Sequence, residues 1–435
     1  MTLDLLRFTT AGSVDDGKST LIGRLLYDTK QVFEDQLEHV AKASERRGGQ
    51  GALDLALLTD GLRAEREQGI TIDVAYRYFA TPGIPGVSEG RRFIIADCPG
   101  HQQYTRNMVT GASTADLSVI LLDARKGVVE QSKRHAFISA LLGIPHLVVA
   151  VNKMDLVDYS RDRFEELVAE FEGFAHRLGG GRTHEILYIP MSALEGDNVV
   201  ERSDQMDWYE GPTLLEHLES VEVAYDHPYE KPARLPVQWV IRPAVRSLDG
   251  AAAGDYRGYA GQIASGALSK GDEIEVLPSG RRTRIAAIDT YDGELEEAVA
   301  PMSVTVRLED ELDVSRGELI CGPEEAPGVG RELEADVCWM SDRPLRKGGR
   351  YAIKQTTSNA NAIVDELKDV VDVHTLERSA GSPAELALND IGRISLRTSS
   401  PIAFDPYARN RRTGSFILID EASNETVAAG MIVGA

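Results

Sequence analysis

The stretch Gly12-Ser-Val-Asp-Asp-Gly-Lys-Ser19 carries the pattern G-x-x-x-x-G-K-[ST]. It follows an apolar run at residues 6–11 and opens an amphipathic run at residues 18–28, the strand–loop–helix context of a phosphate-binding loop. Glycines let the backbone amides face phosphate oxygens, and the helix adds its positive N-terminal end. We expect Lys18 to reach the β- and γ-phosphates and Ser19 to ligate Mg²⁺. The loop residues predicted to bind nucleotide are Gly12, Ser13, Val14, Asp15, Asp16, Gly17, Lys18, Ser19 and Thr20.

Around this loop, apolar runs alternate with amphipathic runs. The apolar runs are rich in Val, Ile and Leu, as in a parallel sheet covered on both faces. Strands are predicted at residues 6–11, 72–79, 92–97, 117–123, 146–152 and 185–191. Helices are predicted at residues 18–28, 104–113, 131–142, 161–174 and 213–221. This alternation predicts a doubly wound, mostly parallel α/β domain.

The pattern changes near residue 225. Residues 226–236, DHPYEKPARLP, read as a linker, and short alternating runs with glycine turns follow it. Strands are predicted there at 236–241, 261–265, 273–277, 284–289, 332–339, 350–355, 392–398 and 414–420. A second break falls at residues 321–330. We therefore expect an α/β domain at 1–224 and two antiparallel β-barrel domains, at 225–327 and 328–435.

A second motif, Asp97-Cys-Pro-Gly-His101, ends the apolar run RFIIAD. A carboxylate at the end of a strand beside the phosphate loop can hold Mg²⁺ through water, so Asp97 is a metal candidate. Gly100 can offer its amide to the γ-phosphate, and His101 can orient the attacking water. The residues of this motif expected to contact the nucleotide are Asp97, Cys98, Pro99, Gly100 and His101.

A third motif, Asn152-Lys-Met-Asp155, follows the apolar run HLVVAV. The Asp155 carboxylate can accept two hydrogen bonds from guanine, and adenine offers no matching donors, so this motif predicts guanine specificity. Lys153 would lie against the base. Asn152 and Met154 complete the motif. A weaker element, Ser192-Ala-Leu194, places Ser192 and Leu194 around the Ala193 amide, which can donate to guanine O6.

A fifth element, Gly69-Ile-Thr-Ile-Asp73, follows a charged run. Thr71 can ligate Mg²⁺ and sense the γ-phosphate, so loss of that phosphate would release the segment Gly69, Ile70, Thr71, Ile72 and Asp73. The alternative is a strand that starts with a threonine. Each motif alone also fits an ordinary glycine turn, structural histidine or Asx turn. Their order on one chain favours a nucleotide site in which His101, Lys18 and Thr71 are catalytic.

Composition narrows the remaining possibilities. The net charge of −22 disfavours nucleic acid as a ligand, since such binding needs a basic face. Arg409, Arg411 and Arg412 form a dense basic group that fits a solvated loop or a partner contact. The 3 cysteines, Cys98, Cys321 and Cys338, lie far apart and predict no disulfide, which fits a reducing cytoplasm. We expect no signal peptide, no membrane span of ~20 apolar residues and no membrane partner.

The five elements together resemble the translation-factor class of GTPases, the superfamily of elongation factor Tu. That resemblance covers nearly the whole chain and includes the two barrels. In that class the histidine of DCPGH positions the hydrolytic water and two apolar residues gate it, which implies these roles for His101, Val14 and Ile70. Ser13 and Asp16 stand where elongation factors usually carry histidine, and Gln102 replaces the glutamate expected after PGH.

Longer strings resemble a particular family, the GTPase large subunit of bacterial sulfate adenylyltransferase. They include GSVDDGKSTLIGRLLYDTK, FIIADCPGHQQYTRNMVTGAS, DARKGVVEQSKRHAFISALLGIPHLVVAVNKMDLVDYS and the late FILIDEASNETVAAGM. Some members carry a fused adenylylsulfate kinase. This chain ends at Ala435 and has no second phosphate-loop motif, so we expect that activity to be absent.

The resemblance implies a GTP-hydrolysing subunit with Mg²⁺ as cofactor and GTP and GDP as substrate and product. Its partner would be a smaller catalytic subunit that binds ATP and sulfate and makes adenylyl sulfate and pyrophosphate, with GTP hydrolysis coupled to that step. Two alternatives are an elongation-factor-like translation GTPase that binds aminoacyl-tRNA and a free-standing regulatory GTPase.

Overall fold

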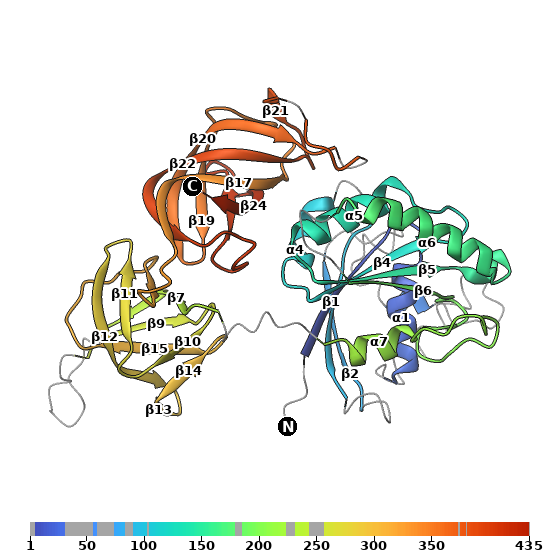
Figure 1. Ribbon diagram of the computed structural model, residues 1–435, viewed down its shortest axis with the longest axis horizontal. Coiled ribbons are helices and arrows are strands. Elements are labelled where there is room, and N and C mark those ends of the chain that lie inside the picture. The colour runs from blue at the N-terminus through green and yellow to red at the C-terminus, as the bar shows by residue number, and fades with distance from the viewer. Residues whose placement is uncertain are drawn as a thin grey trace. The chain divides into compact units, whose positions relative to one another are not determined.

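The computed structural model describes residues 5–30, 55–58, 74–82, 90–101, 104–178, 185–222, 231–242, 256–372, 375–379 and 381–434. These residues fall into two compact units (Figure 1). The first unit comprises those within Met1–Ala224 and Asp372–Glu377, and the second those within Tyr225–Val371 and Arg378–Ala435. All helices that the structure describes belong to the first unit. Among the described residues, no helix is both long enough and apolar enough to cross a membrane.

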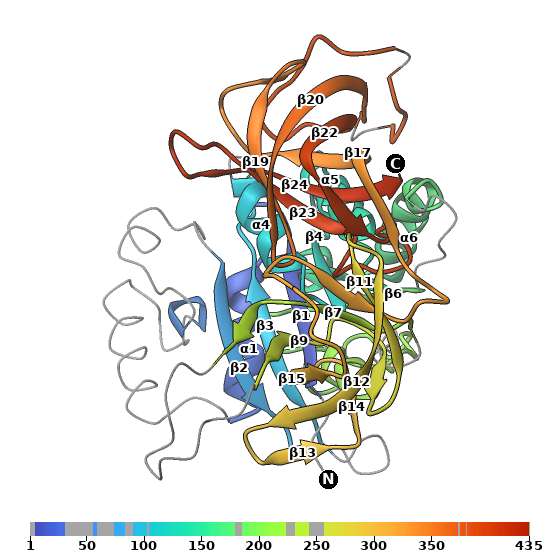
Figure 2. The same ribbon diagram turned by 90° about the vertical axis from the view of Figure 1, so that its left-hand side faces the viewer.

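The first unit is built on a 6-stranded sheet. Its strands are β1 (Leu5–Ala11), β2 (Ala75–Ala80), β3 (Arg92–Asp97), β4 (Leu117–Asp123), β5 (His146–Asn152) and β6 (Glu185–Pro190). Their order is β2-β3-β1-β4-β5-β6, and every pair is parallel except β2–β3. Figure 2 shows β2 and β3 side by side at one edge. All residues of β4 and β5 are buried, as their continuous apolar sequences predict for a sheet covered on both faces.

Among the described residues, five α-helices pack on the two faces of this sheet. They are α1 (Lys18–Asp28), α4 (Thr105–Ala112), α5 (Glu130–Leu141), α6 (Arg161–Ala175) and α7 (Leu214–Ser220); η1 (Leu55–Leu58) and η3 (Met154–Val157) are short 3₁₀ helices. Leucines of α1 and α7 share one hydrophobic core with Val119 and Leu121 of β4. Phenylalanines of α6 share another with Ile120 and Leu122 of the same strand. Alternate residues of one strand thus face opposite helix layers, which confirms the doubly wound prediction.

The second unit begins with an 8-stranded antiparallel sheet. Its strands are β7 (Arg234–Pro236), β8 (Trp239–Ile241), β9 (Gly258–Gln262), β11 (Glu273–Leu277), β12 (Arg281–Thr290), β13 (Gly293–Leu295), β15 (Ser303–Leu308) and β16 (Leu319–Cys321). A small pair, β10 (Ala267–Ser269) and β14 (Glu297–Val299), lies beside it. Leu235, Tyr259, Ile274 and Val306 belong to its core.

The single strand predicted at 236–241 is wrong, because the chain changes partner there. β7 pairs with β16, whereas β8 pairs with β9. At the junction the Val237 N–H donates to Glu318 O (2.8 Å) and the Gln238 N–H donates to Ala260 O (2.9 Å). Two short strands that are adjacent in sequence therefore lie at opposite ends of the sheet, which a local apolar pattern does not predict. The predicted strand at 261–265 is also displaced, since β9 ends at Gln262.

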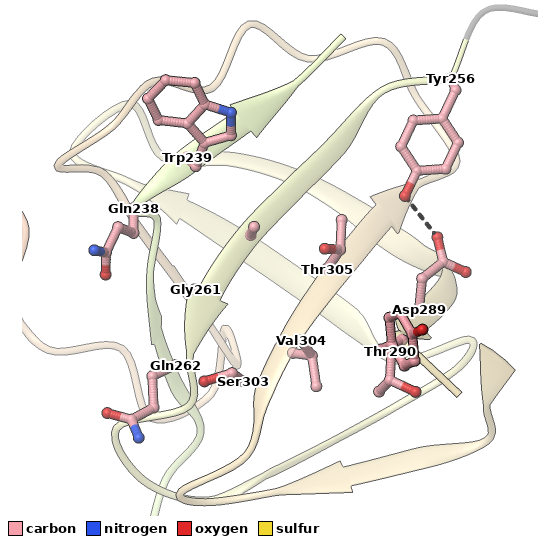
Figure 3. Close-up of a pocket in the computed structure, with 12 residues that line it drawn as sticks. Gln238, Trp239, Tyr256, Gly261, Gln262, Asp289, Thr290, Ser303, Val304 and Thr305 are labelled. Atoms are coloured by element: carbon pink, nitrogen blue, oxygen red, sulfur yellow. Dashed lines mark hydrogen bonds between the residues drawn. The ribbon is translucent and has the colours of Figure 1, made fainter. Parts of the chain in front are cut away.

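A shallow hollow of about 620 Å³ lies on this sheet (Figure 3). Trp239 stands at its rim with 64% of its surface exposed, and the Tyr256 hydroxyl points to Asp289 and donates to it at 2.9 Å. The lining residues come from β8, β9, β12 and β15 and the turns beside them. None of the described lining residues belongs to a nucleotide motif.

The rest of the second unit is a closed antiparallel barrel of β17 (Gly328–Trp339), β22 (Ile391–Phe404), β20 (Ser358–Val370), β19 (Arg350–Gln355), β23 (Ser415–Ile419) and β24 (Thr426–Gly434). A second small pair joins β18 (Leu345–Arg346) to β21 (Glu385–Leu386). Inside the barrel the Phe416 ring covers Gly430 so closely that a Cβ there would lie 2.2 Å from the ring. The predicted antiparallel sheets are thus present, one of them as a closed barrel. Their division at residue 327 stays a prediction.

A buried ion pair joins the two sheets of the second unit. Arg234, next to β16, donates to both carboxylate oxygens of Asp405, at 3.0 and 2.9 Å, and both side chains are almost fully buried. The Thr413 hydroxyl donates to the same carboxylate at 2.6 Å. These bonds order the segment that carries Arg409, Arg411 and Arg412, and Arg409 lies 3.4 Å from Glu325. A partner contact by these three arginines stays a prediction.

Candidate nucleotide-binding site

Four of the five predicted motifs lie at one edge of the first unit's sheet. The phosphate loop follows β1, the Asp97 motif ends β3, the Asn152 motif ends β5 and the Ser192 element follows β6. These four strands are mutually parallel, so their carboxyl ends meet at the same edge. The fifth motif, Gly69–Asp73, lies outside the described residues, as does Gln102.

The phosphate loop turns sharply into α1. Gly17 caps the helix in the left-handed region, with φ of +97°, and a Cβ there would lie 2.4 Å from Asn152 Nδ2. Only glycine fits this position without strain. No side chain caps the first N–H groups of α1. Those amides, with the largely buried Lys18, are suited to bind phosphate oxygens.

Asn152 connects the phosphate loop to the two base-reading elements. Its Nδ2 donates to the Asp16 carbonyl at 2.8 Å, and its Oδ1 accepts from the Ala193 N–H at 2.9 Å. Asn152 is buried, with 2% of the residue exposed. The sequence identified Asn152 as a nucleotide contact but not as the bridge between the loops after β1, β5 and β6. The Ala193 N–H, which is predicted to donate to guanine O6, donates to Asn152 Oδ1 here. A contact with guanine O6 therefore requires that this N–H donate to both oxygens.

The Asp155 carboxylate is held in place by the neighbouring loop. The Ser192 hydroxyl donates to Asp155 Oδ1 at 2.6 Å, and the Met154 N–H donates to Met191 O at 3.1 Å. These bonds, together with those of Asn152, fix the position of Asp155, the residue predicted to bind the base, relative to the phosphate loop. The residues predicted to bind the phosphates and those predicted to bind the base therefore belong to one hydrogen-bonded frame.

Lys153 ties a further loop into the site. Its Nζ donates to the Asp15 carbonyl and, at 3.0 Å, to Asp123 Oδ2. Burial favours the neutral form of Asp123, but hydrogen bonds from Arg125 and Lys153 outweigh it and hold the pKa of Asp123 well below its usual range. Sequence reasoning missed this loop after β4. Its signal was the polar run DARKG directly after a buried strand at the same sheet edge.

The Asp97–His101 segment lies against the phosphate loop. Thr10 donates to the buried Asp97 carboxylate at 3.4 Å, and a Cβ on Gly100 would lie 2.5 Å from Gly12 O. His101 is exposed to solvent. Cys98 is buried, and this burial raises the pKa of its thiol to about 12, so it is an inert packing residue. Cys98, Cys321 and Cys338 form no disulfide with one another, which agrees with the prediction.

The donor set around the phosphate loop fits Mg²⁺ chemically. Ser19 offers a hydroxyl in the first turn of α1, and Asp97, a residue 3% exposed, offers a carboxylate at the end of β3. Hydroxyl and carboxylate oxygens are the ligands that Mg²⁺ prefers, together with water and phosphate oxygens. Thr71, the third predicted ligand, lies outside the described residues. Within those residues, no cluster of three His, Cys, Asp or Glu side chains forms an all-protein metal site.

Helix α5 buries a histidine behind the phosphate loop. His135 is 1% exposed, and its pKa is lowered to about 3, first by burial and then by the charges of Lys18 and Arg134. The pKa of His135 is therefore lower in the folded chain than in the unfolded chain. Between pH 6.5 and about 3, the unfolded chain binds a proton at this histidine and the folded chain does not. His135 therefore makes the fold less stable as the pH falls through that window.

We expect the urea midpoint of wild type to fall between pH 7 and pH 5, and the fall to be smaller in His135→Gln. Circular dichroism at 222 nm follows the first unit, which holds the described helices. His176→Gln, at the exposed end of α6, is the matched control and should keep the wild-type slope. If the urea midpoint fell equally with pH in wild type and in His135→Gln, His135 would not be a source of the pH dependence of stability.

The fold and the site define a GTPase of the phosphate-loop class. The family model described as "Elongation factor Tu GTP binding domain" matches residues 3–223, and "GTP-eEF1A C-terminal domain-like" matches residues 332–433. Among solved structures, sup35 complexed with GDP is 24% identical, with 99% of this chain and 94% of that chain covered and a TM-score of 0.43.

Similar curated proteins identify the family, within this class of GTPases, to which the chain belongs. A Mycobacterium tuberculosis (strain ATCC 25618 / H37Rv) protein named "Bifunctional enzyme CysN/CysC" is 55% identical over 430 residues, covering 99% of this chain and 67% of that protein. "Sulfate adenylyltransferase subunit 1" of Bacteroides fragilis is 52% identical over 431 residues, covering 99% of this chain and 86% of that protein. The Bacteroides thetaiotaomicron protein of that name is 51% identical over 438 residues, with the same coverage. The chain therefore belongs to the family of sulfate adenylyltransferase subunit 1, within the GTPases that carry an elongation factor Tu GTP-binding domain.

Proposed function

We propose that this chain is the GTP-hydrolysing subunit of a two-subunit sulfate adenylyltransferase. Its smaller partner would form adenylyl sulfate and pyrophosphate from ATP and sulfate, the first step of sulfate assimilation. The observation that carries the proposal is the Asn152 side chain, which bonds both the phosphate loop and the Ala193 loop. Such a frame can hold the phosphates and the base of one nucleotide at once.

Each part of the proposed site has a chemical task. Lys18 and the amides at the start of α1 bind the phosphates, and Asp155 accepts from the guanine N1–H and exocyclic amine. Ser19, Thr71 and, through water, Asp97 would hold Mg²⁺, which neutralises phosphate charge when bound. His101 orients the attacking water. No described side-chain cluster in this chain is suited to sulfate chemistry, so we assign that chemistry to the partner.

Coupling requires that the partner distinguish the GTP form from the GDP form. A ligand shifts a conformational equilibrium only by its differential affinity for two states, so the two forms must differ in their contacts with the partner. We propose the Gly69–Asp73 segment and the segment after Asp97 as the moving elements. The acidic chain and its similarity to sulfate adenylyltransferase subunits support this function over a translation factor.

Reconstitution tests the proposal. The purified chain and a catalytic sulfate adenylyltransferase subunit are mixed with ATP and sulfate, and adenylyl sulfate is measured with GTP, GDP or a non-hydrolysable GTP analogue. We expect GTP to raise product formation at least tenfold over GDP, roughly the effect of 1.4 kcal/mol of coupling. Equal amounts of adenylyl sulfate with all three nucleotides would refute the coupling of GTP hydrolysis to product formation. If the chain still bound guanine nucleotides in that case, it would be a GTPase with a different function.

A further inference from the structure

The phosphate loop contains a buried acid, Asp16. Asp16 is 1% exposed, and its Oδ2 accepts the Ser13 N–H at 2.7 Å, so the carboxylate folds back under its own loop. A negative charge in poorly hydrated surroundings repels nearby anions strongly, because water screens it little. Burial also raises the pKa of Asp16, although the Ser13 hydrogen bond and the charges of Lys126 and Lys153 act against that rise.

A lysine from the loop after β4 faces this acid. Lys126 Nζ lies 3.8 Å from Asp16 Oδ1 and donates to the Val14 carbonyl at 3.5 Å. Asp16 Oδ1 has no hydrogen-bond partner among the described residues. The ion pair with Lys126 is therefore the nearest interaction that offsets its negative charge. The turn that presents Lys126 is itself fixed, because the N–H groups of Lys126 and Gly127 both donate to Asp123 O at 3.0 Å.

Lys153, the second lysine whose charge acts on Asp16, is engaged elsewhere. It bonds the Asp123 carboxylate at 3.0 Å, and Arg125 bonds the same carboxylate at 2.7 Å. Asp123 adds a second negative charge beside Asp16. Lys126 therefore compensates the acid most directly, and with 42% of its side chain exposed it does so from the protein surface.

We propose that the Asp16–Lys126 pair sets how long a guanine nucleotide stays bound, with Asp16 weakening the hold of the loop on phosphate and Lys126 offsetting that weakening. The inference rests on the proposed GTPase function. Both are positioning residues, since they act on the nucleotide through the phosphate loop.

Dissociation of a fluorescent GDP from the full chain, measured by stopped flow, tests the pair. Lys126→Met leaves the acid uncompensated and should speed dissociation about tenfold, the size expected when one member of a partly buried pair is removed. Asp16→Asn removes the charge, keeps an acceptor for the Ser13 N–H and should slow dissociation about threefold. In the Asp16→Asn background, Lys126→Met should change the rate less than threefold.

Three controls make the result decisive. Lys126→Arg keeps the charge and should stay within twofold of wild type, and Lys133→Met on α5 should leave dissociation unchanged. Asp16→Ser replaces Asp16→Asn if the asparagine variant fails to fold. Equal effects of Lys126→Met with and without Asp16 would overturn the proposal, because the lysine would then act on the phosphates directly. Failure of wild type to bind GDP more tightly than ADP would instead refute the proposed function.

Discussion

Asp155→Asn is expected to weaken GDP binding about a thousandfold and to make the protein prefer xanthosine diphosphate. In the proposed site the Asp155 carboxylate accepts two charge-assisted hydrogen bonds from guanine, each contributing about 1.5–3 kcal/mol. Asparagine presents an N–H where guanine also presents one, whereas xanthine has a carbonyl at that position. The Ser192 hydroxyl keeps its bond at 2.6 Å to an oxygen in either side chain, so the loop should hold its shape.

Equilibrium titration with fluorescent GDP and xanthosine diphosphate measures this change. The matched control is Asp158→Asn, an exposed position three residues on with a left-handed backbone that asparagine also tolerates. It should leave both affinities unchanged. Unchanged base preference in Asp155→Asn would show that another group reads the base and would remove the strongest support for guanine specificity.

His101→Ala is expected to slow GTP hydrolysis by about 10²–10⁴-fold, the range for loss of a group that positions or accepts a proton. GDP affinity should stay within twofold, because His101 is exposed and follows the segment that contacts the phosphate loop through Gly100. Beside this residue stands Gln102, in place of the glutamate expected after PGH. Hydrolysis is therefore the property most sensitive to this short segment.

Single-turnover hydrolysis with GTP prebound separates chemistry from binding. His176→Ala, at the exposed C-terminal end of α6, is the matched control and should hydrolyse GTP at the wild-type rate. If His101→Ala keeps the wild-type single-turnover rate, another group orients the water. A parallel loss of GDP affinity would instead place His101 among the phosphate-holding groups.

Much of the first unit could be predicted because its signals are local. The runs at 117–123 and 146–152 are apolar throughout, and the structure contains β4 and β5 with those bounds and every residue buried. The helix at 18–28 follows from Gly17 and the amphipathic run after it, and α1 has those bounds. The break between β7 and β8 could not be predicted, because it depends on which distant strands offer free carbonyls.

The sequence by itself determined the class of fold, the order of the motifs and the chemistry that each motif can perform. Those properties depend on residue type and on spacing along a few neighbouring positions, where backbone geometry leaves few choices. The tertiary structure alone decided the partners: Asn152 with the Asp16 carbonyl, Lys126 with the Asp16 carboxylate, and Ser192 with Asp155. These contacts join loops from different strands. Their geometry exists only once the parallel strands have brought their carboxyl ends together.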